Sequence, residues 1–258
     1  MMMVSERTLS EDTNRYKEYD NYAWFWNKYW GRTSARRVLP IVKELVLGKQ
    51  PQGIRVLDVC CGSGQLAKIL SKDGYQLSGI DGSSDMIQLA SQNCTDGNFV
   101  VGDIRVPFPF QEKFHVACSF YDSLNHILCL EDLASAFESV YGVLENNGVF
   151  IFDLNMEDGF KSRWNNRLNQ IVQQDYVCIE HFRYNGDRRI GTNNVTLFLL
   201  QDEWVRKDVC IVEKCYTQSE IIEELSRVGF TNINMFESSE TFNLVDDQGR
   251  YYFVCEKK

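Results

Sequence analysis

One stretch decides the fold of this 258-residue chain: Val56-Leu57-Asp58-Val59-Cys60-Cys61-Gly62-Ser63-Gly64-Gln65-Leu66-Ala67. Residues 54–59 form a short apolar run without helical periodicity, which predicts a strand buried on both faces. After the two glycines, apolar side chains recur at the spacing of a helix, at Leu66, Ile69 and Leu70. A strand, a glycine turn and a helix form a ligand-binding edge of a doubly wound α/β sheet.

The residues of this turn discriminate between two ligands. A dinucleotide fold has the pattern G-x-G-x-x-G with pyrophosphate at the helix amino end, and Gly62, Gly64 and Ala67 fit that pattern loosely. Asp58, at the end of the strand, would repel a diphosphate but suit a cationic amino acid group. This favours S-adenosylmethionine, which has an α-ammonium and a sulfonium and no phosphate. A nicotinamide-dependent oxidoreductase is the alternative.

Residues 58–64 resemble motif I of the class I S-adenosylmethionine-dependent methyltransferases, D/E-x-G-x-G-x-G, with Cys60 in place of the first glycine. The resemblance is carried by residues 50–155. It implies an α/β fold with a doubly wound, mostly parallel seven-stranded sheet of the Rossmann-like methyltransferase type. It also implies S-adenosyl-L-methionine as cofactor, bound at Asp58, Gly62 and Gly64.

Further cofactor contacts are expected at the ends of the following strands. Asp81, with Gly82 beside it, follows the glycine turn by roughly 20 residues, the position of an acidic residue that binds ribose hydroxyls. Met86 is expected on the adenine or simply in the core. The resemblance implies that Asp103 accepts from the adenine amino group, that the Ile104 amide serves a ring nitrogen, and that the Phe120 carbonyl accepts from the cofactor ammonium.

Residues 16–30 are unusually aromatic, which predicts either an amphipathic helix that packs its rings on the core or a lid whose rings attract a sulfonium. Both roles could be shared among different rings. Residues 23–36 also resemble the amino-terminal segment of glycine N-methyltransferases. That resemblance implies cofactor contacts from Trp26, Tyr29 and Arg36, with Arg36 on the cofactor carboxylate; otherwise Arg36 is a solvated helix residue.

Candidate catalytic residues follow the fourth predicted strand, residues 114–120. Polar residues at the carboxyl end of such a strand are site candidates, here Tyr121, Asp122 and His126. Asp122 could face a substrate cation, and His126 could be a general base or a residue that supports the loop, which we favour. Enzymes that methylate glycine carry an arginine where this chain has Asn155, which argues against glycine as substrate.

Four segments are predicted along the chain: a helical lid (1–50), the cofactor-binding core (51–158), a β insertion (159–216) and a carboxy-terminal helix and hairpin (217–258). The insertion is predicted from three β-rich runs, residues 171–184, 194–200 and 205–215, with a hairpin turn at residues 184–187. We expect an antiparallel sheet after strand five that forms the substrate pocket; a dimer flap is the alternative. A polar loop, residues 237–250, is predicted between the last two strands.

Composition excludes several classes of partner. The net charge is −9 and the only basic cluster is Arg32, Arg36 and Arg37, too small to neutralise nucleic-acid phosphates or to bind an anionic membrane. No run reaches transmembrane length and no secretory signal follows Met1. The nine cysteines include no C-x-x-C pair, so we expect a reducing, cytoplasmic location and no metal site. A homodimer stays open.

The predicted function is methyl transfer from S-adenosylmethionine to a small molecule, with an amine favoured over a hydroxyl. Catalysis would consist mostly of positioning, with Asp122, His126 or Tyr121 able to assist deprotonation. Two alternatives are a sensor or partner protein that binds the cofactor without catalysis, and an RNA methyltransferase.

Overall fold

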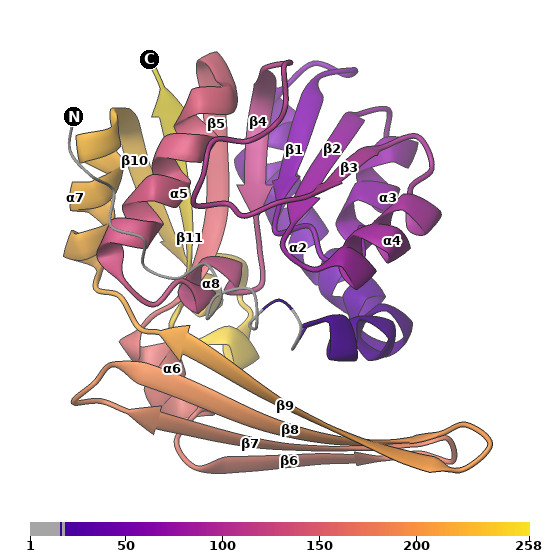
Figure 1. The fold of residues 1–258 in the computed structure, drawn as a ribbon. Coiled ribbons are helices and arrows are strands. Elements are labelled where there is room, and N and C mark those ends of the chain that lie inside the picture. Colours follow the sequence, from indigo (N-terminus) through magenta and orange to yellow (C-terminus); the bar gives the residue numbers. More distant parts are fainter. Residues whose placement is uncertain (1–15, 17–18) are drawn as a thin grey trace, which may run out of the picture.

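The computed structural model describes residue 16 and residues 19–258, which fold into two β-sheets with helices around the larger one (Figure 1). The larger sheet has seven strands in the order β10-β11-β5-β4-β1-β2-β3, and the smaller has four in the order β6-β7-β8-β9. The strands are β1 (Arg55–Val59), β2 (Gln76–Asp81), β3 (Asn98–Val101), β4 (Phe114–Ser119), β5 (Leu144–Asn155), β6 (Arg167–Val172), β7 (Tyr176–Asn185), β8 (Ile190–Leu200), β9 (Trp204–Lys214), β10 (Phe230–Glu237) and β11 (Arg250–Lys257).

The helices alternate with the strands of the larger sheet, as the doubly wound prediction requires. They are the π-helix η1 (Trp26–Trp30), α2 (Gly31–Leu45), η2 (Leu47–Lys49), α3 (Gln65–Lys72), α4 (Ser84–Asn93), η3 (Ser123–His126), α5 (Leu130–Val143), α6 (Glu157–Arg163), α7 (Gln218–Val228), α8 (Ser238–Phe242) and η4 (Val245–Asp247). Within the described part of the chain, none of them is long and apolar enough to cross a membrane.

Side-chain alternation along the central strands builds a core on each face of the larger sheet. Leu57 and Ala117 pack with α5 and α7, whereas their neighbours Val56 and Val116 pack with α2 and α3. Strands buried on both faces are therefore continuous apolar runs, which is why residues 54–59 show no polar alternation. The predicted α/β class with a mostly parallel sheet is confirmed.

The position of the site follows from the strand order. β1 pairs in parallel with both β2 and β4, so the chain reverses its winding direction between β1 and β4. At such a switch point the loops after the strands diverge and leave a crevice at the carboxyl edge of the sheet. The glycine turn after β1 and the polar loop after β4 flank this crevice.

The carboxy-terminal strands complete the sheet. β11 runs antiparallel to both β5 and β10, which confirms the predicted antiparallel pair. The connection between β10 and β11 is not the plain loop that was predicted, since it contains α8 and η4. The Glu237 side chain caps α8 by accepting a hydrogen bond from the Glu240 amide, which accounts for a short helix in a polar stretch.

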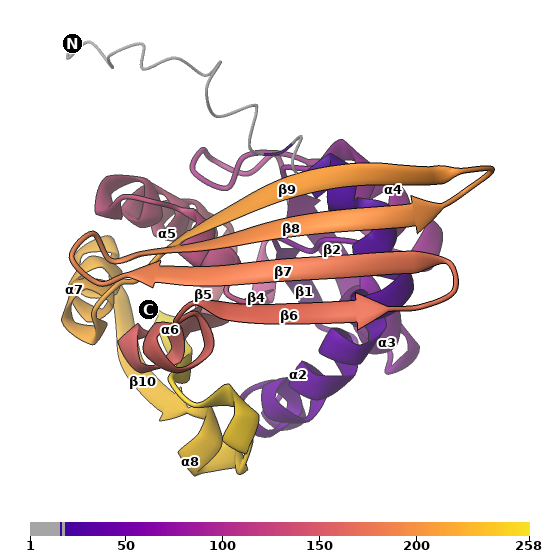
Figure 2. The same ribbon diagram turned by 90° about the horizontal axis from the view of Figure 1, so that it is seen from below.

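The insertion is the four-stranded antiparallel sheet, which lies across the carboxyl edge of the larger sheet (Figures 1 and 2). We name it the cap sheet, residues 167–214. The predicted hairpin at residues 184–187 joins β7 and β8. The prediction of three strand runs was incomplete, because residues 171–184 contain the end of β6, a turn and most of β7. β6 is an exposed edge strand, and its many polar residues hid it.

The turn glycine Gly64 provides a test of this packing. Its φ is +67°, and a Cβ would lie 2.9 Å from Ala90 of α4. We expect Gly64→Ala to lower the free energy of unfolding by about 2–4 kcal/mol, the sum of a left-handed backbone and overpacking. Gly142, in α5 with open space around it, is the matched control, and Gly142→Ala should stabilise by up to about 1 kcal/mol. Urea denaturation measures both, and equal stability of the two variants would contradict the packing.

Candidate active site

A cavity of about 630 Å³ lies between the carboxyl edge of the larger sheet, the cap sheet and the amino-terminal helical segment. This volume is in the range of small-molecule binding pockets. Most of the predicted site residues line it: Trp26, Asp58, Gly62, Asp81, Gly82, Met86, Asp103, Ile104, Phe120, Tyr121, Asp122 and His126.

Three predicted site residues do not line the cavity. Tyr29 donates a hydrogen bond to Asp175 of the cap sheet at 3.0 Å. Arg36 is exposed on α2. Gly64 lies at the amino end of α3, where it permits the close approach to α4 described above. Tyr29 therefore contacts the cap sheet, Arg36 faces solvent, and Gly64 lies in the contact between α3 and α4.

Asp81 ties the glycine turn to the end of β2. Its two carboxylate oxygens accept hydrogen bonds from the Gly62 amide at 2.8 Å and the Ser83 amide at 2.9 Å. Burial raises the pKa of Asp81, while these amides act to lower it. Ser83 also caps α4, because its side chain accepts a hydrogen bond from the Met86 amide. The carboxylate is thus fixed at the cavity wall between two loops.

Asp58 is buried at the end of β1. In the described part of the chain its carboxylate accepts only a weak hydrogen bond, from Cys118 Sγ at 3.9 Å. Burial, and then the charge of Asp81, raise the pKa of Asp58 to about 7. A buried carboxylate without a cation beside it favours a positively charged ligand.

Asp103 faces the cavity beside β3 with a cation already in place. Burial acts to raise its pKa, but Arg105, which donates to both oxygens at 2.6–3.1 Å, lowers it below the usual range. Arg105 also contacts Asp132 of α5 at 3.1 Å. The sequence analysis did not identify Arg105. An arginine two residues after a predicted site carboxylate could have indicated an ion pair with that carboxylate.

The backbone is strained where β1 and β4 end. Cys60, Tyr121 and Asp122 have φ values of 60°, 64° and 51°, in the left-handed region that favours glycine. Cys60 occupies the position of the first motif glycine and adopts the conformation that glycine would supply. Strained residues persist only where the surrounding structure enforces them, and they gather at functional sites.

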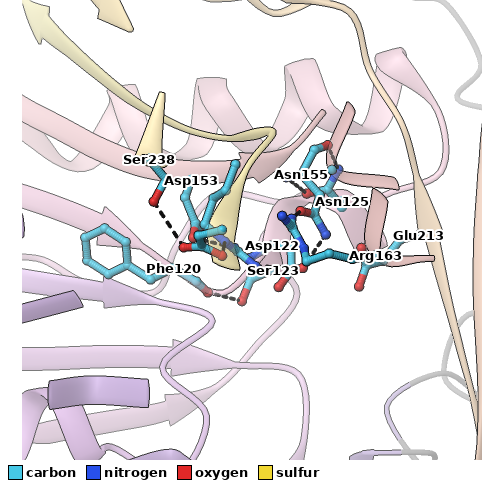
Figure 3. A network of polar contacts seen from close by, with 12 residues as sticks. Phe120, Asp122, Ser123, Asn125, Asp153, Asn155, Arg163, Glu213 and Ser238 are labelled. Atoms are coloured by element: carbon cyan, nitrogen blue, oxygen red, sulfur yellow. Dashed lines mark hydrogen bonds and ion pairs between the residues drawn. The ribbon is translucent and has the colours of Figure 1, made fainter. Parts of the chain in front are cut away.

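A largely buried arginine, Arg250 of β11, organises the loop after β4, whose Asp122 and Ser123 lie beside Asp153 in Figure 3. It pairs with Asp153 at 2.6 Å, with Asp122 at 3.2 Å and with Asp247 at 3.1 Å. Asp122 further accepts from Asn155 Nδ2 at 2.8 Å, and its amide donates to Asp153 at 2.8 Å. Asp122 is therefore held by structural partners on several sides. The sequence did not predict a role for Arg250, because Asp122 and Asp153 lie far from it in the chain.

His126, on η3, is linked to the amino-terminal segment. Its Nε2 lies 2.9 Å from the Tyr19 hydroxyl, and its Nδ1 lies 3.3 Å from the Val212 carbonyl of β9. Burial raises the pKa of the Tyr19 phenol well above its usual value. The imidazole thus connects the lid, the loop after β4 and the cap sheet.

The inner face of the cap sheet contributes polar residues that the sequence analysis missed. Glu180 of β7, Asn193 of β8 and Glu213 of β9 are buried and line the cavity. Along each of these strands every second side chain faces inward, and most of the inward side chains are apolar, such as Cys178, Val195 and Val209. Glu180, Asn193 and Glu213 occupy inward positions of the same kind. A charged or amide residue in an inward position is the signal that would have revealed them.

The aromatic segment divides its rings between the cap sheet and the cavity. Phe25 and Tyr29 contact Tyr176 of β7, with ring centroids 5.2 and 4.0 Å apart. Trp26, in a π-helical turn, lies beside Gly62 and has its ring centroid 6.1 Å from that of Tyr121. Core packing is therefore present in this segment, and Trp26 lines the cavity, while contact of a ring with a sulfonium stays a prediction.

The donor set of the cavity fits S-adenosylmethionine better than a dinucleotide. Acidic residues lie at the ends of β1 and β2 and just after β3, as a ligand with a cationic amino acid group and a ribose requires. Near the glycine turn, a Cβ at Gly62 would point toward Trp26 and Met86, so the turn presents backbone to the space beneath the rings. Arg105, which also lines the cavity, pairs with Asp103 and Asp132.

Comparison with known proteins agrees with this fit. Residues 56–148 match the family model of a methyltransferase domain. A putative methyltransferase of Bacillus subtilis is 32% identical over 107 residues, 40% of this chain and 43% of the relative. A glycine/sarcosine N-methyltransferase of Aphanothece halophytica is 26% identical over 219 residues, 79% of this chain and 76% of the relative.

The fold is also similar to that of a solved methyltransferase structure. The crystal structure of an S-adenosylmethionine-dependent methyltransferase from Clostridium acetobutylicum superimposes with a TM-score of 0.75 at 20% identity, covering 93% of this chain and 98% of that one. The motif, the carboxylates at the strand ends and the sheet order agree with these matches: residues 56–148 match a methyltransferase domain, and the chain has the fold of S-adenosylmethionine-dependent methyltransferases.

Proposed function

We propose that the protein transfers a methyl group from S-adenosylmethionine to the nitrogen of a small-molecule amine. The observation that carries the proposal is the composition of the cavity on the side away from the glycine turn. There the cap sheet, residues 167–214, covers the site and contributes the buried carboxylates of Glu180 and Glu213. A covered, acidic compartment suits a small cationic acceptor.

The residues of the chain would act mainly by positioning. When bound, the cofactor supplies a methyl group on a positively charged sulfur. Asp58 and Asp81 hold its polar ends, and the strained backbone at Tyr121 keeps the loop after β4 against the cavity. His126 can hold a proton near the acceptor through its contact with Tyr19. Covering the site excludes water and fixes orientation, which is worth up to about 7–11 kcal/mol in favourable cases.

Similarity beyond the cofactor domain supports an amine. The alignment with the glycine/sarcosine N-methyltransferase covers 79% of this chain, so it includes more than the residues 56–148 of the family model. Asn155, where glycine-methylating enzymes have an arginine, still argues against glycine itself. We therefore propose an amine other than glycine, with the cap sheet as the element that defines it.

A cofactor-binding sensor without catalysis is the second candidate. It is favoured by one observation: Asp122, a predicted catalytic residue, is fully engaged by Arg250, Asn155 and the Asp153 network. An RNA acceptor is disfavoured by the net charge of −9.

Removal of the ribose-binding carboxylate tests the cofactor site. We expect Asp81→Ala to abolish measurable binding of S-adenosylmethionine and S-adenosylhomocysteine in calorimetric titration, because the variant loses both the ribose acceptor and the Gly62 contact. Asp85→Ala, on the exposed first turn of α4, is the matched control and should bind like the wild type. NAD should bind to none of them. Retained binding by Asp81→Ala would contradict the ribose assignment.

The raised pKa of Asp58 predicts a pH dependence of cofactor affinity. The α-ammonium of the cofactor requires the ionised carboxylate, so affinity should rise as the pH passes upward through about 7. Between pH 6.0 and 7.5 the ionised fraction, and hence the association constant, should increase about eightfold. Asp58→Asn should bind more weakly and with a flat profile over this interval. A wild-type profile that is equally flat would show that Asp58 does not meet the ammonium.

Methyl uptake tests the acceptor. With cofactor labelled in the methyl group, we expect label to enter members of a panel of small primary and secondary amines, and not phenols or alcohols of the same size, because the cap sheet contributes the buried carboxyl groups of Glu180 and Glu213 to the cavity. Label on hydroxyl compounds alone would overturn the amine proposal. Tight cofactor binding without label in any compound would favour the sensor.

A further inference from the structure

Two buried acceptor atoms on the cavity side of the cap sheet have no hydrogen-bond partner among residues 16 and 19–258. They are Oε2 of Glu213 and Oδ1 of Asn193. Glu213 is 3% exposed and Asn193 is 4% exposed. Unpaired acceptors are rare in buried positions, since each forfeits its hydrogen bonds to water. Both residues line the cavity, so a ligand is able to reach them.

Glu180 shows what a satisfied carboxylate looks like on the same sheet. Its Oε2 accepts from Asn169 Nδ2 at 2.8 Å and its Oε1 accepts from Asn193 Nδ2 at 3.2 Å. The cap sheet therefore can supply amide donors to a buried carboxylate, and it supplies none to Glu213 Oε2. Glu180 is therefore a carboxylate with structural partners, whereas Glu213 has an oxygen that is available to a ligand.

The surroundings of Glu213 do not neutralise it through a direct ion pair. Its Oε1 is 3.9 Å from His126 Nε2, at the limit of an ion pair. Arg250 is bound to Asp122, Asp153 and Asp247. Burial, and then the charge of Asp122, raise the pKa of Glu213 well above its usual value, while Arg250 and a hydrogen bond with Asn155 act to lower it. Arg163 and Asn155 lie side by side (Figure 3), and Arg163 donates a hydrogen bond to Asn155 Oδ1. Arg163 also donates to the Gln248 carbonyl.

We infer that Glu213 binds the ammonium group of the methyl acceptor and selects an amine over a hydroxyl compound. Glu213 then takes one ammonium proton, so that the neutral nitrogen can form a bond to the methyl carbon while the bond from that carbon to the cofactor sulfur breaks. This inference rests on the proposed function and deepens it. An ammonium provides N–H donors and a positive charge, which together satisfy an unpaired carboxylate oxygen that is buried in the cavity wall. A neutral hydroxyl provides one donor and no charge.

Asn193 gives the subsite its second contact. In the cap sheet Asn193 pairs with Ile211, two residues before Glu213 on β9, so the two side chains are diagonal neighbours on one face. The hydrogen bond from Asn193 Nδ2 to Glu180 leaves its Oδ1 unpaired. An acceptor with a second N–H or O–H group beside its ammonium would meet both atoms.

The test compares Glu213→Gln with the wild type and with Glu203→Gln, a control at the exposed turn between β8 and β9. With the amine of the panel that the wild type methylates best, kcat/KM should fall on the order of 100-fold in Glu213→Gln, since a charged contact is lost. S-adenosylhomocysteine affinity, measured by calorimetry, should stay within about twofold in both variants. Glu203→Gln should match the wild type throughout.

Stability gives a second readout that needs no acceptor. At pH 8 the glutamine variant should unfold at the same or a higher urea concentration than the wild type, because an unpaired buried carboxyl group, whose pKa burial raises well above its usual value, is replaced by a neutral amide of the same shape. A lower midpoint would show a structural carboxylate and overturn the inference, as would an unchanged kcat/KM for the amine. Methylation of hydroxyl compounds alone by the wild type would instead overturn the proposed function, and this inference with it.

Discussion

The guanidinium of Arg250 is the constraint on which the site depends. It joins the first residue of β11 to the end of β5 through Asp153, to the loop after β4 through Asp122, and to η4 through Asp247. A buried cation with three carboxylates is stable only as a complete set, since removal of one partner leaves an unpaired buried charge. The last strand of the chain thus fixes the loop that borders the cavity.

The inner face of the cap sheet serves two functions along its length. Toward the β8–β9 turn it is apolar, and Tyr176, Cys178 and Leu197 pack against the aromatic lid residues Tyr22 and Phe25. Farther along it becomes polar where it faces the cavity. The lid is therefore anchored by the same sheet that supplies the wall of the acceptor compartment, so the geometry of the lid and of that compartment are linked.

Carboxylates gathered at the strand ends make the site a source of instability in the ligand-free protein. The folded-state pKa of Asp58, about 7, exceeds its ordinary value near 3.8. The folded protein therefore holds more protons than the unfolded chain between these two values, and the stability contributed by this group is lost as the pH rises through that window. A cationic ligand beside the carboxylate restores the balance, which is a physical reason for acidic strand ends at a site for a sulfonium amino acid.

The local sequence was sufficient for the elements that depend on short-range patterns. The strand, glycine turn and helix of residues 54–70 follow from apolar runs and from two glycines. The carboxylates at the ends of β1 and β2 and after β3 follow from their distance to the glycine turn and to the predicted strand ends. The capping box at Thr217 and Glu220 and the hairpin at residues 184–187 are also encoded within a few residues. Each of these features is set by neighbours in the chain, so the sequence alone determined them.

Only the tertiary structure decided which side chains share the cavity. Arg250 and Asp122 are 128 residues apart, and Glu213 meets His126 only because the cap sheet folds back across the carboxyl edge. Tyr29 and Arg36 match a pattern in the sequence, yet the rotation of the lid and of α2 turns them toward the cap sheet and the solvent. Burial and charge pairing depend on long-range packing, and packing brings together residues that no local pattern connects.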